Sequence, residues 1–297
     1  MSVGNWFEQF CNNIKFADKD LSNLRYRYRQ ITKRINLEYW NSTSEELHSL
    51  YVGSYGRGTA THLSDIDMLV ILPYTTYLRI NNRQGNKQSA LLQEIKLSLQ
   101  KTYSTSHIRA DGQVVGIDFS DGINFEIVPV FENQDGSFLY PYTNYWGSWK
   151  ETNPKKEIDE MNQYNNLTNG NLKKLCKMLR EWKDEKNVDI SGYAIDTLAY
   201  NFIKYWDNKD KSYMYYDWMT RDFFKFLSEQ NESAVLYAPG SYNTLYIGKR
   251  FNNKANTAYE KAKEAIADEN KYSSYAKSEW REIYGTKFPI WSVRISN

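Results

Sequence analysis

Apolar side chains near the start of the chain recur every three or four positions, which is the spacing of one face of an amphipathic helix. The apolar positions are Leu21, Leu24, Tyr28, Ile31 and Ile35. The other faces of this predicted helix carry the cations Arg25, Arg27, Arg29, Lys33 and Arg34. We expect a solvated basic face on a helix that packs on the core, with contact to RNA as the alternative.

After this helix the pattern becomes extended. Residues 48–52 precede a Gly/Ser turn, and residues 66–72 (IDMLVIL) form a β-branched run that Pro73 stops, as in a buried strand. Helical spacing returns over residues 90–103. Two Asp-Gly turns then divide residues 106–131 into three strands of an antiparallel meander.

From about residue 153 onward the spacing is helical almost to the end of the chain. The predicted helices cover residues 172–182, 193–206, 217–229 and, in two pieces, 256–284. We therefore predict an α+β fold with two domains. Residues 1–152 contain a mixed sheet and the long N-terminal helix, residues 153–297 are helical, and the active site is expected in the cleft between them.

Composition narrows the class of protein. Lys and Arg number 38 and Asp and Glu 36, a net charge of +2, which is too balanced for a DNA-coating protein or a polybasic membrane anchor. Mean hydropathy is −0.73, no apolar run approaches the ~20 residues of a spanning helix, and the N-terminus lacks a secretory signal pattern. We expect a cytoplasmic protein without a membrane partner. Cys11, Cys176 and three histidines are too few for a disulfide framework or a zinc module.

A glycine-rich segment, Gly53–Thr59 (GSYGRGT), is the first candidate for chemistry. Three glycines in six residues let backbone N–H groups approach a phosphate closely, and the Ser54 hydroxyl adds a donor. A tight turn between a strand and a helix is the structural alternative. The segment lacks the Lys-Ser/Thr ending of a P-loop.

Two aspartates follow this segment. Asp65 and Asp67 flank Ile66 at the start of a predicted strand, so both carboxylates lie on one face while Ile66 points into the core. Two carboxylates so close repel each other unless a divalent cation lies between them, and such oxygen ligands suit Mg²⁺ bound to a substrate triphosphate. The alternative is that Asp65 caps a turn and Asp67 faces solvent.

The glycine-rich segment and the aspartate pair are more specific together than either is alone. A Gly-Ser loop, an Asp-x-Asp strand and the later acid Glu126 (NFEIVPV) resemble the polymerase-β-type nucleotidyltransferases. The long N-terminal helix, GSYGRGTA, SDIDMLVIL, FEIVPVF and TNPKKEID together resemble the cyclic-GMP-AMP-synthase/dinucleotide-cyclase-like nucleotidyltransferases, the CD-NTases of bacterial anti-phage signalling. The resemblance covers nearly the whole chain.

The resemblance implies roles for five residues in the first half of the chain. Gly53 and Ser54 match the loop that holds the donor triphosphate. Asp65, Asp67 and Glu126 match the three acids that bind two Mg²⁺ ions, or Mn²⁺ in their place. Glu126 lies where the family more commonly has aspartate.

The resemblance also implies a nucleotide site in the helical half, where the chain departs from the family pattern at two positions. Arg180 stands where relatives usually have lysine, and Gly192 stands where relatives place serine, with Ser191 one position earlier. Tyr193 matches the aromatic residue that stacks on the base. We expect removal of Arg180 to weaken use of the donor triphosphate; if Arg180 pointed to solvent, far from the acids, Lys177 would be the substitute. Ordinary helix surface or core is the alternative for Arg180, Ser191 and Tyr193.

The choice of Glu126 over Asp118 depends on strand register. A two-residue turn at 121–122 pairs Asp118 with Phe125, which places Asp118 and Glu126 on opposite faces of the hairpin. The family pattern then selects Glu126, three residues before Pro129. If Asp118 instead shared the face of the other acids, the turn would not be the simple two-residue one assumed here, and Glu126 would be the wrong third ligand. A partner for a nearby cation is the alternative role of Glu126.

The function implied by the resemblance is condensation of nucleoside triphosphates into a cyclic dinucleotide or oligonucleotide, with release of pyrophosphate. The product would act on a downstream effector. Alternatives are synthesis of linear oligonucleotides, nucleotidylation of a protein or tRNA, and a non-catalytic RNA-binding relative. Activation by double-stranded DNA is not implied, because the chain lacks a Cys/His cluster for a zinc-bearing insertion.

We predict that the double substitution Asp65→Asn with Asp67→Asn abolishes nucleotide transfer while the protein stays folded, because these side chains supply charge for metal ions rather than packing. Product formation and circular dichroism measure the two outcomes. Undiminished product formation would refute the enzymatic assignment.

Overall fold

The computed structural model describes residues 2–63 and 65–290, and internal contacts divide the chain into two compact units. The helical unit contains the segment up to Lys15, residues 59–61 and the chain from Asp159 onward. The sheet unit contains residues 16–58 and 62–158. The domain boundary that we predict at residues 152 and 153 stays a prediction.

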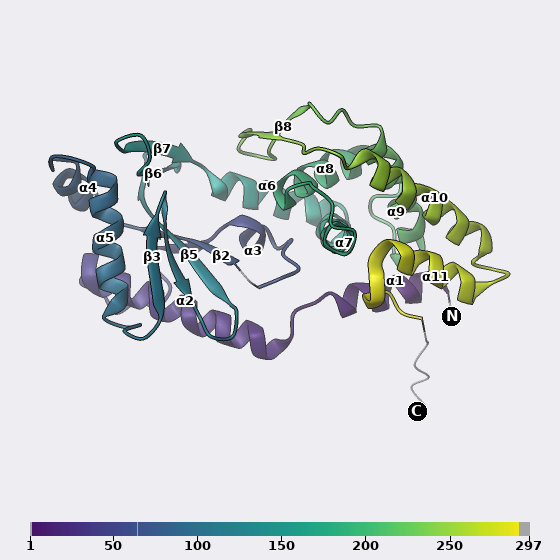
Figure 1. Ribbon diagram of the computed structural model, residues 1–297, viewed down its shortest axis with the longest axis horizontal. Helices are drawn as coiled ribbons and strands as arrows, with labels where there is room; N and C mark the ends of the chain where they lie inside the picture. The colour runs from purple at the N-terminus through teal and green to yellow at the C-terminus, as the bar shows by residue number, and fades with distance from the viewer. Residues whose placement is uncertain (1, 64, 291–297) are drawn as a thin grey trace. The chain divides into compact units, whose positions relative to one another are not determined.

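The sheet unit is built on a seven-stranded mixed sheet (Figure 1). Its strands are β1 (Ser49–Tyr51), β2 (Asp65–Ile71), β3 (His107–Asp111), β4 (Val114–Asp118), β5 (Asn124–Glu132), β6 (Phe138–Tyr142) and β7 (Ser148–Thr152). Its helices are α2 (Asp18–Tyr39), α3 (Gly53–Arg57), α4 (Tyr74–Asn81) and α5 (Lys87–Gln100). The order is β1-β2-β5-β4-β3, with β6 paired to β5 and β7. The pair β2–β5 is parallel and the other pairs are antiparallel.

One face of this sheet is covered by α2 and α5. Their buried side chains form a single cluster with alternate residues of β2, β3, β4 and β5. The helix face predicted from Leu24, Ile31 and Ile35 is confirmed, since these three side chains are almost fully buried in that cluster. Because side chains alternate along a strand, the polar residues of β2 and β5 occupy the opposite face.

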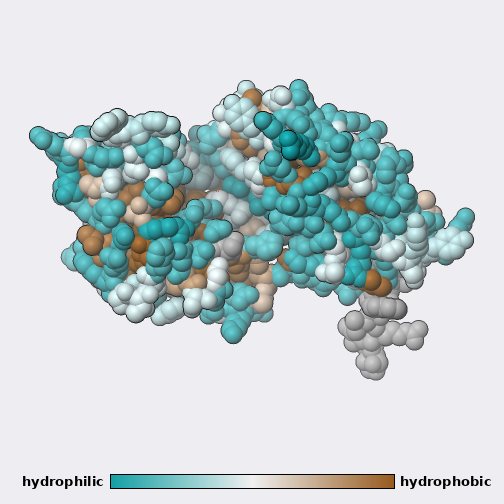
Figure 2. Space-filling model, in the orientation of Figure 1, coloured by the Kyte–Doolittle hydropathy of each residue, from teal (hydrophilic) through white to brown (hydrophobic). Residues whose placement is uncertain are grey.

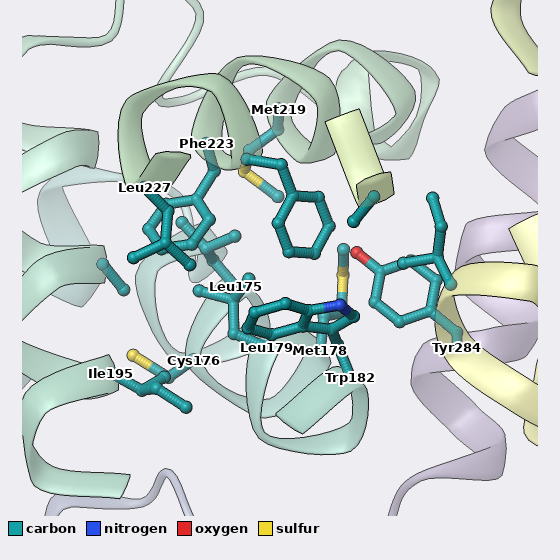
Figure 3. Close-up of a cluster of buried hydrophobic side chains, with 14 of the residues drawn as sticks. Leu175, Cys176, Met178, Leu179, Trp182, Ile195, Met219, Phe223, Leu227 and Tyr284 are labelled. Atoms are coloured by element: carbon teal, nitrogen blue, oxygen red, sulfur yellow. The ribbon is translucent and has the colours of Figure 1, made fainter. Parts of the chain in front are cut away.

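The helical unit has a large aromatic core (Figure 3). Its elements are α1 (Val3–Asn13), α7 (Asn171–Glu185), α8 (Gly192–Tyr205), η1 (Tyr213–Tyr215), α9 (Tyr216–Ser228), β8 (Val235–Tyr237), β9 (Thr244–Tyr246), α10 (Asn252–Asp268), α11 (Ser273–Tyr284) and η2 (Gly285–Lys287). Helix α6 (Pro154–Leu167) begins in the sheet unit and ends in the helical unit. Trp182, Phe223 and Tyr284 meet in this core, so the predicted α+β class with a mixed sheet and a helical part is confirmed.

Helix α1 comes first in the chain yet packs on its last helices. Phe7 contacts the rings of Trp280 and Phe288 at centroid distances of 5.0 and 5.3 Å, and Phe10 contacts Tyr284 at 4.5 Å. Such aromatic pairs add to the stabilisation from buried apolar area. The start of the chain therefore completes the helical unit.

The basic face predicted for α2 is largely neutralised by acids. The ion pairs are Arg27–Asp121 (2.8 Å), Arg29–Glu46 (3.4 Å), Lys33–Glu45 (3.1 Å) and Arg34–Glu38 (2.5 Å). Four of the five predicted cations thus have an acidic neighbour within the sheet unit. This pairing leaves little net charge for RNA phosphates and argues against the RNA-contact alternative.

The surface turned toward the viewer in Figure 2 is mostly hydrophilic, with apolar residues in small patches. None of the helices in the described ranges is long and apolar enough to cross a membrane.

In the helical unit, the buried Asp217 lies near the half-buried Glu269, and neither is a predicted site residue. Asp217, in the first turn of α9, is 2% exposed, and its Oδ1 has no hydrogen-bond partner among the described residues. Burial raises the pKa of Asp217 to about 7; the charge of Glu269 adds to the shift, while the Trp218 amide and Arg221 oppose it. Burial raises the pKa of Glu269 as well. The folded protein therefore holds a proton on Asp217 that the unfolded chain loses at lower pH.

We expect Asp217→Asn to raise the melting temperature, relative to the unmodified protein, by a margin that grows between about pH 4 and pH 7. In that window the unfolded carboxyl is ionised while the folded one keeps its proton, so the unmodified protein loses up to about 1.4 kcal/mol of unfolding free energy per pH unit. Thermal unfolding across this range measures the difference, with the exposed Asp210→Asn as the matched control. If the difference in melting temperature between Asp217→Asn and the unmodified protein did not change with pH, Asp217 would be ionised in the folded protein.

Candidate active site

The acids of β2 lie on the open face of the sheet, as predicted. Asp65 is exposed, Asp67 is half-buried, and Ile66 between them is fully buried in the core. The parallel register of β2 and β5 pairs Asp65 with Asn124 and Asp67 with Glu126. Neighbouring strands are about 4.8 Å apart. Asp67 and Glu126 are therefore direct neighbours on one face, although they are far apart in the sequence.

The ionised form of Asp67 is disfavoured by this arrangement of acids. Burial raises the pKa of Asp67 to about 6, and the negative charges of Glu126 and Asp65 add to the shift. Arg57 acts in the opposite direction. The carboxylates are thus crowded enough to disfavour one another's charge, and a bound cation would relieve that repulsion.

Gly53 opens α3 directly beside Asp67. Its φ of +58° lies in the left-handed region, and a β-carbon there would lie 2.8 Å from Asp67 Cγ, and closer still to Oδ2. Only glycine allows the backbone to approach the carboxylate so closely. Ser54 follows as the second residue of α3 and is half-buried. The predicted phosphate loop and the predicted metal acids are therefore in contact within the sheet unit.

Arg57 is a site residue that the sequence analysis did not single out. It is 7% exposed and forms a buried ion pair with Glu157 of α6 at 3.5 Å. Its charge also favours the ionised form of Asp67. Its position between Gly56 and Gly58 was the feature of the sequence that could have identified it.

The predicted register of the β4–β5 hairpin is wrong. Asp118 pairs with Asn124, and Gly116 pairs with Glu126, so Asp118 shares the face of Glu126. The connection between the strands spans residues 119–123 rather than two residues. Asp121 lies in this connection, where its carboxylate accepts two hydrogen bonds from Arg27 at 2.8 Å and one from the Ile123 amide at 3.3 Å.

Asp118 nevertheless lies one strand further from β2 than Glu126 does. Its carboxylate is held by Arg109 and by His107, the latter at 2.8 Å. Arg109 also crosses Gly116 to lie 3.9 Å from Glu126. The shared face of Asp118 and Glu126 meets the condition stated above for rejecting Glu126, so the register no longer selects between the two acids. The position of Glu126 beside Asp67 is its remaining geometric support, and the identity of the third ligand stays untested.

The donor chemistry of the three acids fits a hard divalent cation. All offer carboxylate oxygens from one face of the sheet, the kind of ligand that Mg²⁺ prefers. Within residues 2–63 and 65–290, no three Asp, Glu, His or Cys side chains converge as a complete metal site.

The helical unit places Arg180 against α8. Its Nε and Nη2 donate to the two carboxylate oxygens of Asp196 at 3.0 and 2.8 Å, and Nη2 also donates to the Gly192 carbonyl at 2.8 Å. The Thr59 hydroxyl donates to the same carboxylate at 2.7 Å. Thr59 directly follows the Gly53–Gly58 segment in the chain. The sequence analysis missed Asp196, whose signal was an acid among the mostly apolar residues of the first two turns of α8.

Ser191 and Tyr193 lie at the start of α8. Ser191 is the N-cap, and its Oγ accepts a hydrogen bond from the Ala194 amide at 3.0 Å. This cap accounts for the serine by itself. Tyr193 is half-buried in the first turn. The phosphate and base contacts expected of these two residues, and of Arg180, stay predictions.

Comparisons with known proteins identify the family and the fold. Residues 1–165 match the family model described as Second Messenger Oligonucleotide or Dinucleotide Synthetase domain. A "Probable cyclic nucleotide synthase" of Bacillus cereus is 24% identical and is matched over 86% of this chain and 88% of its own. A "Cyclic AMP-AMP-AMP synthase" of Acinetobacter sp. is 22% identical, over 87% and 78%.

Among solved structures, the Vibrio cholerae cyclic AMP-GMP synthase DncV, in complex with a linear intermediate, aligns with a TM-score of 0.70 at 14% identity. The alignment covers 95% of this chain and 96% of that one. These comparisons confirm the CD-NTase resemblance and the fold predicted from the sequence.

We expect Gly53→Ala to lower nucleotide transfer by at least about 100-fold, because the new methyl group displaces the Asp67 carboxylate and a misplaced catalytic group costs that order of rate. Gly85→Ala is the matched control: its φ is +77°, and a β-carbon there has nothing within 4 Å. Both variants carry similar backbone strain, so thermal unfolding of Gly85→Ala measures the cost of that strain, and any further loss of stability and of product formation in Gly53→Ala reports the clash with Asp67. Equal activities would show that the clash is harmless.

Proposed function

The chain belongs to the Second Messenger Oligonucleotide or Dinucleotide Synthetase family and is a nucleotidyltransferase, and we propose that it condenses nucleoside triphosphates into a cyclic dinucleotide or oligonucleotide. Each condensation forms a phosphodiester bond between a ribose hydroxyl and an α-phosphate and releases pyrophosphate. The printed names of both curated relatives describe cyclic nucleotide synthesis.

One observation carries the proposal. Asp67 and Glu126 lie side by side on parallel strands, with the Gly53 backbone packed against the Asp67 carboxylate. A phosphate-approaching loop in contact with paired acids is what transfer from a triphosphate requires, because the loop fixes the phosphates and the acids act at the reacting centre.

We propose that Asp65, Asp67 and Glu126 hold two Mg²⁺ ions, or Mn²⁺. When bound, these ions would activate the attacking ribose hydroxyl and stabilise the leaving pyrophosphate. The half-burial of Asp67 keeps its carboxylate fixed, and Arg57 favours its ionised form. The protein's own contribution is thus orientation and charge at the open face of the sheet.

The finer parts of the proposal follow from the family resemblance. We place the reaction in the cytoplasm, where nucleoside triphosphates are available, and assign the product to anti-phage signalling through a downstream effector. A non-catalytic RNA-binding role is disfavoured by the pairing of the α2 cations with acids and by the presence of all three candidate acids.

Product analysis tests the proposal. The purified protein is incubated with all four nucleoside triphosphates and Mg²⁺ or Mn²⁺, treated with phosphatase, and analysed by mass spectrometry. We expect a phosphatase-resistant cyclic product that disappears with a chelator. Linear products or a labelled protein or tRNA would assign the same centre to one of the alternative reactions, and no nucleotide product would overturn the proposal.

A further inference from the structure

The sheet unit has a cavity among its helices, on the side that does not carry the acids. It has a volume of about 500 Å³ and lies where helices α2, α4 and α5 meet (Figure 1). A cavity of this size can hold a small molecule. Because α2 and α5 cover the sheet face opposite to Asp67, the cavity is separate from the candidate active site.

Three hydroxyl groups line this cavity and make no hydrogen bond to any described residue. They belong to Tyr39 of α2, Thr76 of α4 and Ser98 of α5. Ser98 is 2% exposed, and its Oγ is buried without a partner, although a helical serine commonly bonds the carbonyl one turn earlier. Since buried polar groups are nearly always hydrogen-bonded, the Ser98 hydroxyl indicates a polar ligand in this cavity.

The charged groups around the cavity leave a surplus of positive charge. Each of the two acids that line it, Glu38 and Glu94, is shared by two cations. The ion pairs are Lys101–Glu38 (2.8 Å), Arg34–Glu38 (2.5 Å), Arg79–Glu94 (2.8 Å) and Arg83–Glu94 (2.7 Å). Four cations and two acids give a surplus of two positive charges, so the cavity favours a ligand with two negative charges.

The Tyr39 hydroxyl lies within reach of charges from all three helices. Burial raises the pKa of Tyr39; the charges of Glu94 and Glu38 add to the shift, while Arg79 and Arg34 oppose it. These charged groups come from α5, α2 and α4, so they converge on one part of the cavity. The hydroxyl keeps its proton there and is a hydrogen-bond donor for an anion.

We propose that this cavity binds a small phosphate monoester. The three hydroxyls donate to the phosphate oxygens, which only accept, and Arg79 and Lys101 supply the positive charge. A phosphate monoester carries close to two negative charges at neutral pH, which matches the surplus. Leu97, which is 61% exposed at the cavity, offers an apolar surface to the organic part of the ligand. This site does not rest on the proposed function.

A phosphorus NMR titration of the full chain with glucose 6-phosphate tests the site. We expect a Kd below about 1 mM, the range for a ligand of this size. Inorganic phosphate should bind at least about fivefold more weakly because it lacks the organic part, and glucose should not compete. Asp65→Asn with Asp67→Asn, titrated in a chelator, should leave the Kd unchanged, since those acids lie on the other sheet face.

Arg79→Gln tests the charge. We expect it to weaken binding of glucose 6-phosphate about tenfold, because it removes a charge-assisted contact. Arg29→Gln is the matched control: Arg29 and Arg79 are 53% and 52% exposed, and each pairs with a glutamate of the sheet unit. Arg29 does not line the cavity, so Arg29→Gln should leave the Kd unchanged.

Ser98→Ala separates a binding role from a structural one. It should weaken binding about fivefold, yet raise the melting temperature of the protein without ligand by about 2–4 °C, because it removes a buried hydroxyl that has no partner. Thr197→Val is its control. Thr197, in the helical unit, also has a buried hydroxyl without a described partner, so this variant should be stabilised with no change in binding.

The outcomes either support the site or overturn it. A Kd above about 10 mM for glucose 6-phosphate, or equal effects of Arg79→Gln and Arg29→Gln on binding, would overturn the proposal. Tighter binding of inorganic phosphate or of succinate, a dianion without phosphorus, would show that the assigned ligand class is wrong. A loss of stability without a loss of binding in Ser98→Ala would assign that hydroxyl to the fold and contradict its role as a donor.

Discussion

The parallel pairing of β2 with β5 is the constraint on which the sheet unit depends. It sets Asp67 beside Glu126, residues that are otherwise separated by two helices and two strands. Ile66 and Phe125, the residues next to them in each strand, are fully buried on the other face. Each buried side chain of this size contributes about 1.5–3 kcal/mol. A one-residue slip would expose these apolar residues, so the same burial that stabilises the sheet also fixes the carboxylates.

The parallel pair also explains the path of the chain. Two parallel strands need a crossover, because a tight turn can join only antiparallel strands. Here the crossover from β2 to β5 contains α4, α5, β3 and β4, and α5 covers the apolar face that β2 and β5 create. The segment that separates the acids in sequence is therefore the segment that lets them meet.

Features encoded by local spacing could be predicted from the sequence, and features set by distant partners could not. The Asp-Ile-Asp strand and the apolar face of α2 follow from periods of two and of three to four residues. The connection of the β4–β5 hairpin places Asp121 against Arg27, 94 residues away in the sequence, and no turn rule contains that ion pair. The partner of Arg180 could not be predicted from local spacing either, because Asp196 lies on the next helix. Helix α1 was not predicted, although its apolar residues Trp6, Phe7 and Phe10 recur with helical spacing; only the core that it joins is set by distant partners.

Three glycines show a common way of holding charge in this protein. A β-carbon at Gly53 would collide with Asp67, one at Gly116 with Arg109, and one at Gly192 with Arg180. In each case a charged group rests on bare backbone, where the absence of a side chain lets it approach. Two of these groups, Arg109 and Arg180, are also ion-paired, with Asp118 and Asp196, so contact with backbone and pairing with an acid fix their orientation together. Glycines in this chain are therefore informative not only about turns but also about where charge is placed.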